Sequence, residues 1–298
     1  MVFNHLIGVR FPVGPPKFNM KLLRVGQSNN EIPAIIDSNG IIRNLSSIIK
    51  DLNRETINFK LIDKINNCKI KNLPEISNKS RIGPCVSNPE KFIGIGLNYR
   101  AHAKETSATA PNEPIVFFKA NSSINGPNDN VYLPKDSLKS DWEVELGVII
   151  GKEGKNISED KSMDHIFGYC IVNDISEREY QLEKSSGQWD KGKAFDSFGP
   201  IGPFVVTKDE IKDIQNLNLE LKLNKKVMQS DNTKNMIFSV KHIVSYLSFF
   251  MTLKPGDIIS TGTPPGCGIG RNPQVFLKSG DEMVLKIDNL GIQKQKVL

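Results

Sequence analysis

Short apolar segments separated by polar turns run through most of the chain, a pattern typical of a protein built mainly from β-strands. Near the start, residues 21–25 and 32–36 predict strands, and the sequence Asp-Ser-Asn-Gly at residues 37–40 predicts a turn. Residues 41–42 continue as a third short strand, and residues 45–52 predict a helix. The first part of the chain is therefore expected to form a small α/β unit.

From Lys91 onward, apolar segments alternate with turns rich in Gly and Pro, at residues 199–203, 254–257 and 278–281. This alternation predicts a mainly β architecture with few helices. One helix is expected after Ser239, whose side chain suits an N-cap. The apolar residues that follow have the i, i+3, i+4, i+7 spacing of a helix face; they are Val240, Ile243, Val244, Leu247, Phe250 and Met251.

Local composition divides the chain into three parts. Residues 1–19 are interrupted by prolines and predict an N-terminal extension. Residues 20–84 predict a small domain, which ends in a stretch rich in Asn, Lys and Pro at residues 72–84. Residues 85–298 predict a larger domain, which holds the candidate catalytic residues.

The overall composition excludes several classes of protein. With 38% hydrophobic and 24% charged residues among 298, the chain is expected to fold as a globular protein. No run approaches the roughly 18 apolar residues of a membrane span, and no signal peptide is predicted. The four cysteines lack Cys-x-x-Cys spacing, which suits free thiols in a cytoplasmic protein. The net charge is +6, but the lysines are scattered, so nucleic acid is not an expected partner.

Three acidic residues lie where apolar strands are expected. Glu143 and Glu145 alternate with apolar residues, and Asp174 closes the apolar run 167–173. Residues two apart on a strand share a face, so Glu143 and Glu145 should converge. Burial of such charges without a partner is costly, and an all-oxygen set favours Mg²⁺ or Mn²⁺. On spacing alone, a solvated strand edge remains the alternative.

A histidine and a glutamate form a second candidate site. His102 and Glu105 are three residues apart on a predicted helix, so the carboxylate can orient the imidazole for proton transfer. A surface pair without function fits the same spacing. Gly94 and Gly96 precede this helix but lack the third glycine of a dinucleotide-binding loop, so no nucleotide cofactor is predicted.

Five blocks of sequence, taken together, resemble one enzyme family. They are Gly-Leu-Asn-Tyr-x-x-His-x-x-Glu (96–105), Asp-Trp-Glu-Val-Glu-Leu-Gly-Val (141–148), Gly-Tyr-Cys-Ile-Val-Asn-Asp-Ile-Ser-Glu-Arg (168–178), Lys-Gly-Lys-Ala-Phe-Asp-Ser-Phe-Gly-Pro-Ile-Gly-Pro (191–203) and Ser-Thr-Gly-Thr-Pro-Pro-Gly-x-Gly (260–268). Over residues 91–298, they are similar to the fumarylacetoacetate hydrolase family. The resemblance implies an α+β, mainly β fold, in which a mixed β-roll follows a small N-terminal α/β domain. It also implies a homodimer.

The resemblance assigns roles to both candidate sites. Glu143, Glu145 and Asp174 would hold a divalent metal, Mg²⁺ or Mn²⁺, with positions left open for substrate and water. His102 and Glu105 would form a catalytic dyad on a lid that closes over bound substrate.

Four further residues match family positions that face the substrate. Lys193 matches a lysine that stabilises negative charge, which suits an oxo acid that becomes an enolate. Arg178 and Gln181 match positions at the far end of the substrate, and Thr263 matches a threonine at its carboxylate. Lys193 is thus implied to be catalytic, and the other three to bind substrate.

One departure from the family pattern narrows the range of expected substrates. The animal fumarylacetoacetate hydrolase has an additional glutamate after its Thr-Gly-Thr sequence, whereas this chain continues with Pro264, Pro265 and Gly266. The chain therefore looks like the smaller acylpyruvase-type and sugar-acid-type members.

The predicted function is metal-dependent hydrolysis of a C–C bond in a short 2,4-dioxo acid, with release of pyruvate. The substrate would be an acylpyruvate or a 2,4-diketo-3-deoxy sugar acid. The alternatives are a lyase, decarboxylase, hydratase or isomerase on a related oxo acid, such as ureidoglycolate lyase or oxaloacetate decarboxylase. A metal-dependent oxo-acid-binding protein without activity is a further alternative. The expected partner is a small-molecule substrate, with no nucleic acid and no membrane.

Overall fold

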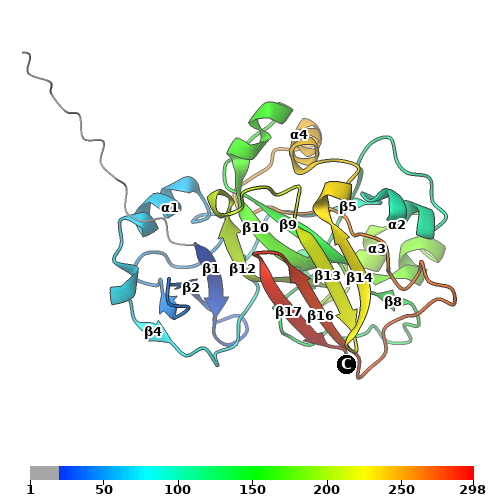
Figure 1. Cartoon of the computed structure of the whole chain (residues 1–298), viewed down its shortest axis with the longest axis horizontal. Coiled ribbons are helices and arrows are strands. Elements are labelled where there is room, and N and C mark those ends of the chain that lie inside the picture. The colour runs from blue at the N-terminus through cyan, green and yellow to red at the C-terminus, as the bar shows by residue number, and fades with distance from the viewer. Residues whose placement is uncertain (1–19) are drawn as a thin grey trace, which may run out of the picture.

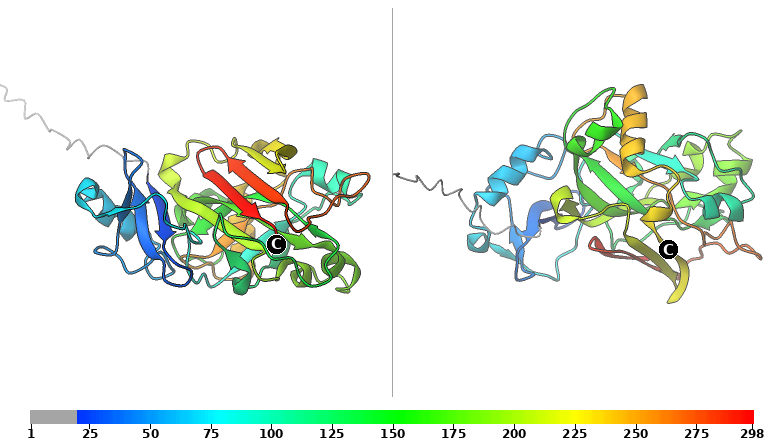
Figure 2. Two further views of the ribbon diagram at one scale, coloured as in Figure 1. Left: turned by 90° about the horizontal axis from the view of Figure 1, so that it is seen from below. Right: turned by 45° about the horizontal axis from the view of Figure 1, so that its top comes forward.

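The structure is a computed structural model that describes residues 20–298, so the extension predicted at residues 1–19 lies outside the described residues. A smaller unit built from the early strands lies beside a larger, β-rich unit (Figure 1). Figure 2 shows the same arrangement from two further directions. The strands occupy the middle of the larger unit, and the main hydrophobic core packs around them.

Within residues 20–298, the strands form a large sheet of eleven strands, a four-stranded sheet and a two-stranded sheet. The large sheet has the order β4-β3-β2-β1-β12-β10-β9-β15-β5-β6, with β7 paired to β12. Its strands are β1 Lys21–Val25, β2 Ile32–Ile36, β3 Ile42–Asn44, β4 Glu75–Ile76, β5 Phe92–Gly96, β6 Ile115–Phe118, β7 Ile124–Asn125, β9 Val144–Ile150, β10 Ile166–Asn173, β12 Gly199–Thr207 and β15 Ile258–Ser260. The four-stranded sheet has the order β14-β13-β16-β17, with β13 Asn218–Leu223, β14 Lys226–Asn232, β16 Glu282–Ile287 and β17 Gly291–Lys296. The two-stranded sheet pairs β8 Ser140–Asp141 with β11 Ser176–Glu177.

Helices are few and short in the described part of the chain. The α-helices are α1 Phe59–Asn66, α2 Arg100–Glu105, α3 Asp190–Lys193 and α4 Val240–Phe250. Short helices of other types lie at Ile70–Asn72, Asn121–Ser123, Glu159–His165, Glu179–Glu183, Lys208–Glu210 and Thr233–Asn235. None of the helices in residues 20–298 has the length and apolar character needed to cross a bilayer.

β9 and β10 are antiparallel neighbours in the middle of the large sheet, and every residue of both strands is buried. Val144 and Leu146 of β9 pack into the main core, which also contains residues of the four-stranded sheet. The register sets Val172 opposite Glu145, so the end of β10 lies beside the beginning of β9. This pairing positions the acidic residues at the two strand ends.

The small unit extends the large sheet. β1 pairs with β2 on one side and with β12 on the other, where Leu22 lies opposite Val205. Leu22 and Val205 belong to a second hydrophobic core, which also contains Leu61 and Ile65 of α1. The strands predicted at the start of the chain are therefore present, and they continue the sheet of the larger unit.

The prediction of a helix at residues 45–52 is wrong, because this segment forms turns. The carbonyl oxygen of Leu45 accepts a hydrogen bond from the N–H of Ile49 at 3.0 Å, but no regular helix follows. Asp51 forms an ion pair with Arg24 of β1 at 2.7 Å, while Leu45 and Ile49 are buried in the second core. These tertiary contacts outweigh the modest helical preference of the segment.

The helix predicted after Ser239 is present as α4 and confirms the spacing argument. The Ser239 hydroxyl oxygen accepts a hydrogen bond from the backbone N–H of His242 at 3.2 Å, as an N-cap should. The buried face of the helix consists of Val240, Ile243, Val244, Leu247 and Ser248.

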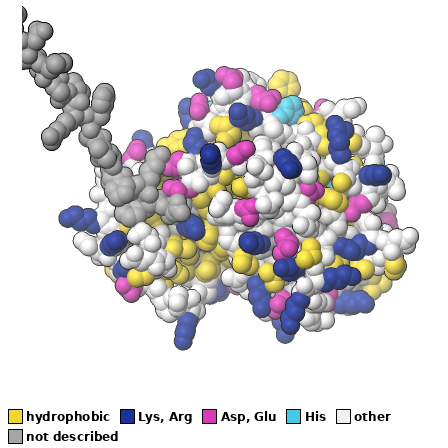
Figure 3. Space-filling model, in the orientation of Figure 1, with side chains coloured by type: hydrophobic (Ala, Val, Ile, Leu, Met, Phe, Trp, Pro, Cys, Tyr) yellow, Lys and Arg dark blue, Asp and Glu magenta, His cyan; other side chains and the backbone are white. Residues whose placement is uncertain are grey.

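The charged side chains are spread over the face of the molecule drawn in Figure 3. Lys and Arg side chains lie across this face, with Asp and Glu side chains between many of them.

We predict that Ser239→Ala lowers the free energy of unfolding by about 1 kcal/mol, because the first turn of α4 loses its side-chain acceptor. Equilibrium urea unfolding measures this change. Ser239→Asp keeps an acceptor at the cap and serves as the control. Equal stability of wild type and Ser239→Ala would show that the cap contributes nothing.

Candidate active site

Three carboxylates converge where β9 begins and β10 ends. Glu143 precedes β9, Glu145 lies within it, and Asp174 follows β10. The backbone N–H of Asp174 donates to the carbonyl oxygen of Glu143 at 2.9 Å, which joins the two strand ends. One oxygen of each carboxylate lies within 4.8 Å of the others, and all three residues are buried. The structure thus brings together the three residues predicted to hold a metal.

Two buried lysines neutralise part of this charge. The Lys193 Nζ atom lies 2.7 Å from Glu143 Oε2 and 2.7 Å from Asp174 Oδ2. Burial lowers the pKa of Lys193, but Asp174 and Glu143 outweigh this effect and raise it above its ordinary value. Lys119 Nζ lies 2.7 Å from Asp174 Oδ1, and its pKa is lowered because burial outweighs that carboxylate. Lys119 was not among the predicted site residues, although a charged residue directly after the apolar strand β6 was a usable signal.

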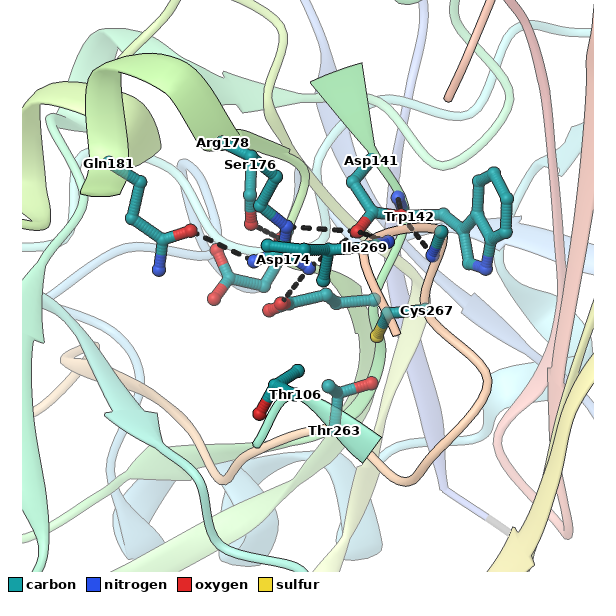
Figure 4. Close-up of polar contacts among 12 residues, drawn as sticks. Thr106, Asp141, Trp142, Asp174, Ser176, Arg178, Gln181, Thr263, Cys267 and Ile269 are labelled. Atoms are coloured by element: carbon teal, nitrogen blue, oxygen red, sulfur yellow. Dashed lines mark hydrogen bonds and ion pairs between the residues drawn. The ribbon is translucent and has the colours of Figure 1, made fainter. Parts of the chain in front are cut away.

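Arg178 links the triad to a fourth buried carboxylate. One of its terminal nitrogens lies 2.7 Å from Glu143 Oε1 and 2.7 Å from Asp141 Oδ2. Asp141 also accepts hydrogen bonds from the backbone N–H groups of Gly268 at 2.7 Å and Ile269 at 3.0 Å (Figure 4). Asp141 therefore holds both the arginine and a loop of the cavity wall. The sequence contained a signal for it, because Asp141 continues the alternation of Glu143 and Glu145.

Glu145 has no ion pair with a lysine or arginine among residues 20–298. Its Oε2 accepts hydrogen bonds from the Ser260 hydroxyl at 2.6 Å and from the Gly262 N–H at 2.7 Å. The φ angle of Gly262 is +98°, which glycine adopts readily. Burial, together with the carboxylates of Asp174 and Glu143, raises the pKa of Glu145 well above its ordinary value. The free protein therefore holds a carboxyl group that lacks a compensating cation.

The pKa of Glu143 shifts the other way. Burial raises it, but Lys193 and Arg178 outweigh burial and lower it. The pKa values of Glu143 and Glu145 thus shift in opposite directions, because only Glu143 has cationic partners among the described residues.

The balance of charge fits a divalent metal at the triad. Among the described residues, the cluster holds four buried carboxylates and three buried cations; they are Asp141, Glu143, Glu145 and Asp174, and Lys119, Arg178 and Lys193. With all four carboxylates ionised, one negative charge is left over, and Glu145, whose pKa is raised, is the carboxylate without a cationic partner in this part of the chain. Three converging carboxylates are the hard oxygen ligands that Mg²⁺ and Mn²⁺ prefer. The residues present therefore fit such a metal.

A cavity of about 160 Å³ opens onto the triad. His102, Glu143, Glu145 and Lys193 contribute to its polar part. Its apolar wall consists of Ile95, Leu97, Phe117, Leu182, Trp189 and Ile269. Two of the three metal candidates and the histidine of the predicted dyad therefore face the same small space.

The dyad is held in place by the backbone. His102 Nδ1 lies 2.8 Å from Glu105 Oε1, and both residues are on α2. The two oxygens of Glu105 accept the N–H of Gly266 at 3.0 and 2.8 Å. His102 is 5% exposed. The structure therefore gives an imidazole that is oriented by a carboxylate, which is itself fixed to a loop.

The three residues predicted to bind substrate also line the cavity. Arg178 donates to Gln181 Oε1 at 2.9 Å, so the two act as one unit. The Thr263 hydroxyl donates to the carbonyl oxygen of Val144 at 3.0 Å and accepts from Gln229 at 2.8 Å. These bonds fix the orientation of each side chain at the wall.

Comparison with known proteins gives the family. A family model described as "Fumarylacetoacetate (FAA) hydrolase C-terminal" matches residues 91–298. A Burkholderia ambifaria protein whose name states no substrate is 52% identical over 277 residues, which are 93% of this chain and 98% of that protein.

Solved structures are similar over nearly the whole chain. The fumarylacetoacetate hydrolase of Exiguobacterium antarcticum has a TM-score of 0.81 and 31% identity, and the match covers 93% of this chain and 99% of that chain. The 2-hydroxyhepta-2,4-diene-1,7-dioate isomerase of Mycobacterium marinum has a TM-score of 0.74 and 29% identity, with 94% and 98% covered. Maleylpyruvate hydrolase of Sphingobium sp. SYK-6, in complex with manganese(II) and pyruvate, has a TM-score of 0.78 and 27% identity, with 94% and 99% covered.

These similarities confirm the predicted fold class, which is α+β and mainly β. They also confirm the resemblance drawn from the five sequence blocks. This chain belongs to the fumarylacetoacetate hydrolase family, whose members are enzymes.

Proposed function

We propose that this chain is a divalent-metal-dependent hydrolase that cleaves the C3–C4 bond of a short 2,4-dioxo acid and releases pyruvate. One observation carries the proposal: Glu143, Glu145, Lys193 and His102 line a single small cavity, and Asp174 completes the triad behind it. The similarity to a maleylpyruvate hydrolase solved with manganese(II) and pyruvate supports it.

Glu143, Glu145 and Asp174 would hold Mg²⁺ or Mn²⁺. When bound, the metal would supply a Lewis acid for the carboxylate and 2-oxo oxygens of the substrate. With Glu145 ionised, the buried cluster has one negative charge in excess, so a divalent cation turns its balance to one positive charge. That balance favours an anionic oxo acid in the cavity.

Lys193 would stabilise the negative charge that develops on the substrate. Its raised pKa keeps it a charged ammonium group, which has three N–H donors. Glu143 and Asp174 accept two of them, and this fixes the position of the nitrogen. The remaining donor serves the enolate oxygen that forms as the C–C bond breaks.

His102 would move the proton. Glu105, fixed by Gly266, orients the imidazole so that one nitrogen accepts a proton from the attacking water. The water oxygen bonds to C4, the C3–C4 bond breaks, and its electron pair forms the enolate of pyruvate. The imidazolium then returns the proton to C3, so the products are pyruvate and a carboxylic acid.

The cavity wall favours an apolar substrate tail. Both of the long cationic side chains that line the cavity, Lys193 and Arg178, are already paired with two carboxylates each. Leu182 and Ile269 offer no partner for a distal carboxylate or for sugar hydroxyls. We therefore favour acylpyruvates with a short apolar acyl group over diketo sugar acids.

An isomerase is the second candidate. The similarity to the 2-hydroxyhepta-2,4-diene-1,7-dioate isomerase of Mycobacterium marinum favours it. The same residues serve both reactions, because an imidazole that returns a proton to carbon can also move it between carbons without attack by water. The lyase and decarboxylase alternatives stay predictions from the sequence.

A homodimer and a cytoplasmic location also stay predictions. Large apolar side chains are exposed at Leu138 (78%), Phe249 (68%) and Tyr132 (59%). Such residues would suit an interface with a second subunit.

We predict that the stability of metal-free protein falls as pH rises above about 4.5, the ordinary pKa of a glutamate. The folded state keeps a proton on Glu145 that the unfolded chain releases, so rising pH favours unfolding. Melting temperatures across a pH series, with chelator or with Mn²⁺, measure this. Added Mn²⁺ should remove the decline.

Variants of the triad provide the control. Glu145→Gln should flatten the pH dependence and abolish stabilisation by Mn²⁺. Glu143→Gln and Asp174→Asn should each abolish metal-dependent activity. Full activity in chelator-treated wild-type protein would contradict the metal site.

We predict that His102→Asn and Glu105→Gln each lower kcat by roughly 10²–10⁴-fold, the usual range for loss of an acid–base group. Metal affinity and affinity for oxalate, a mimic of the pyruvate enolate, should change little. Steady-state kinetics and calorimetric titration measure the two effects. Loss of oxalate binding with unchanged kcat would reverse the assignment.

A substrate panel tests the reaction itself. Acylpyruvates with short apolar tails should yield pyruvate, detected with lactate dehydrogenase, at higher kcat/KM than diketo sugar acids or dicarboxylic analogues. The apolar wall is the physical reason, because it leaves a distal charge without a partner. If no compound yields pyruvate while an oxo acid is isomerised or decarboxylated, the hydrolase proposal fails.

A further inference from the structure

A second group of metal-binding side chains adjoins the triad. One ligand atom each from His102, Glu105 and Cys267 lies within 4.8 Å of the others. His102 and Cys267 are buried, and Glu105 is partly buried. This group joins a helix and a loop that are far apart in the sequence, and the proposed hydrolysis uses only its histidine and glutamate.

The loop that carries Cys267 is fixed to the dyad. Gly266, its neighbour, donates its backbone N–H to both oxygens of Glu105, at 3.0 and 2.8 Å. Gln229 Nε2 lies 3.5 Å from the Cys267 sulfur and 2.8 Å from Thr263 Oγ1. Figure 4 shows Cys267 near Thr263. The thiol is therefore held beside the dyad before any ligand arrives.

The donor set differs in kind from the triad. The triad offers oxygens alone, whereas this cluster offers an imidazole nitrogen, a carboxylate oxygen and a sulfur. Zinc binds such sets, with bonds of about 2.0–2.3 Å that place tetrahedral donors roughly 3.5 Å apart. Donors within 4.8 Å need only a small contraction to reach that geometry. Three protein ligands also leave a fourth position open to water.

We propose that His102, Glu105 and Cys267 form a zinc site, separate from the carboxylate triad, and that zinc bound there inhibits the enzyme. The inhibition rests on the proposed function, because zinc occupies the imidazole that would otherwise accept a proton and the carboxylate that orients it. Binding of zinc by itself does not depend on the proposed reaction.

Binding must release a proton. Burial raises the pKa of the Cys267 thiol well above its ordinary value, so the sulfur is protonated in the free protein. Zinc forms a bond to the sulfur, and the S–H bond breaks with loss of H⁺ to solvent. No oxidant or reductant is needed.

X-ray absorption at the zinc edge tests the site in wild-type protein. One equivalent of zinc is added in the presence of excess Mg²⁺, which occupies the triad. We expect one sulfur neighbour at about 2.3 Å from the metal. A shell of oxygen and nitrogen alone would overturn the proposal, and the measurement needs neither a variant nor turnover.

Inhibition kinetics test the consequence. Cys267→Ala should weaken inhibition by zinc roughly tenfold or more, since one ligand is lost. Uninhibited turnover should stay unchanged, because Cys267 does not line the cavity. Cys68→Ala, which removes a partly buried thiol in the small unit, is the matched control and should keep full sensitivity. Equal inhibition of Cys267→Ala and wild type would place zinc at the triad and overturn the inhibitory role.

X-ray absorption and the assay for pyruvate together distinguish a failure of the zinc site from a failure of the proposed function. A sulfur neighbour in wild-type protein that forms no pyruvate from any 2,4-dioxo acid would support the zinc site and contradict the hydrolase. Pyruvate formation with an oxygen and nitrogen shell would do the reverse.

Discussion

The compensation of buried charge is the interaction on which the rest of this structure depends. Four carboxylates and three cations lie in the interior near the ends of β9 and β10, where isolated charges would be strongly destabilising. Lys193 and Arg178 pair with Glu143, but neither they nor Lys119 forms an ion pair with Glu145. Because one carboxylate, that of Glu145, has no ion pair within residues 20–298, the cluster can bind a cation. A cluster with every charge compensated would have no such capacity.

The same charges join the fold to the chemistry. Asp141 orders the loop at Gly268, and Glu105 holds that loop at Gly266, so one short segment connects the ionic cluster to the dyad. Removing one member of such a network leaves its partners buried without compensation, and stability falls along with function. Metal and dyad sites therefore share a wall, and their difference in ligand chemistry is what lets them respond to different metals.

The sequence by itself determined the class of fold and the main residues of the site. The alternation of apolar and polar positions predicted strands, and the i, i+4 pattern after Ser239 predicted α4, because these periods reflect local geometry. Glu143 and Glu145 could be paired because residues two apart on a strand share a face. The resemblance of five sequence blocks gave the family, which the comparisons confirm.

Only the tertiary structure decided which residues act together across the chain. Residues 45–52 form turns because Asp51 pairs with Arg24, a partner that no local pattern reveals. Lys119 lies against Asp174, and Cys267 lies beside the dyad, because strands distant in sequence pair within one sheet. The periodicity of a sequence predicts which way a side chain points from its own strand or helix. It does not predict where the next strand lies, and the position of that strand sets the charge balance and the ligand sets of this site.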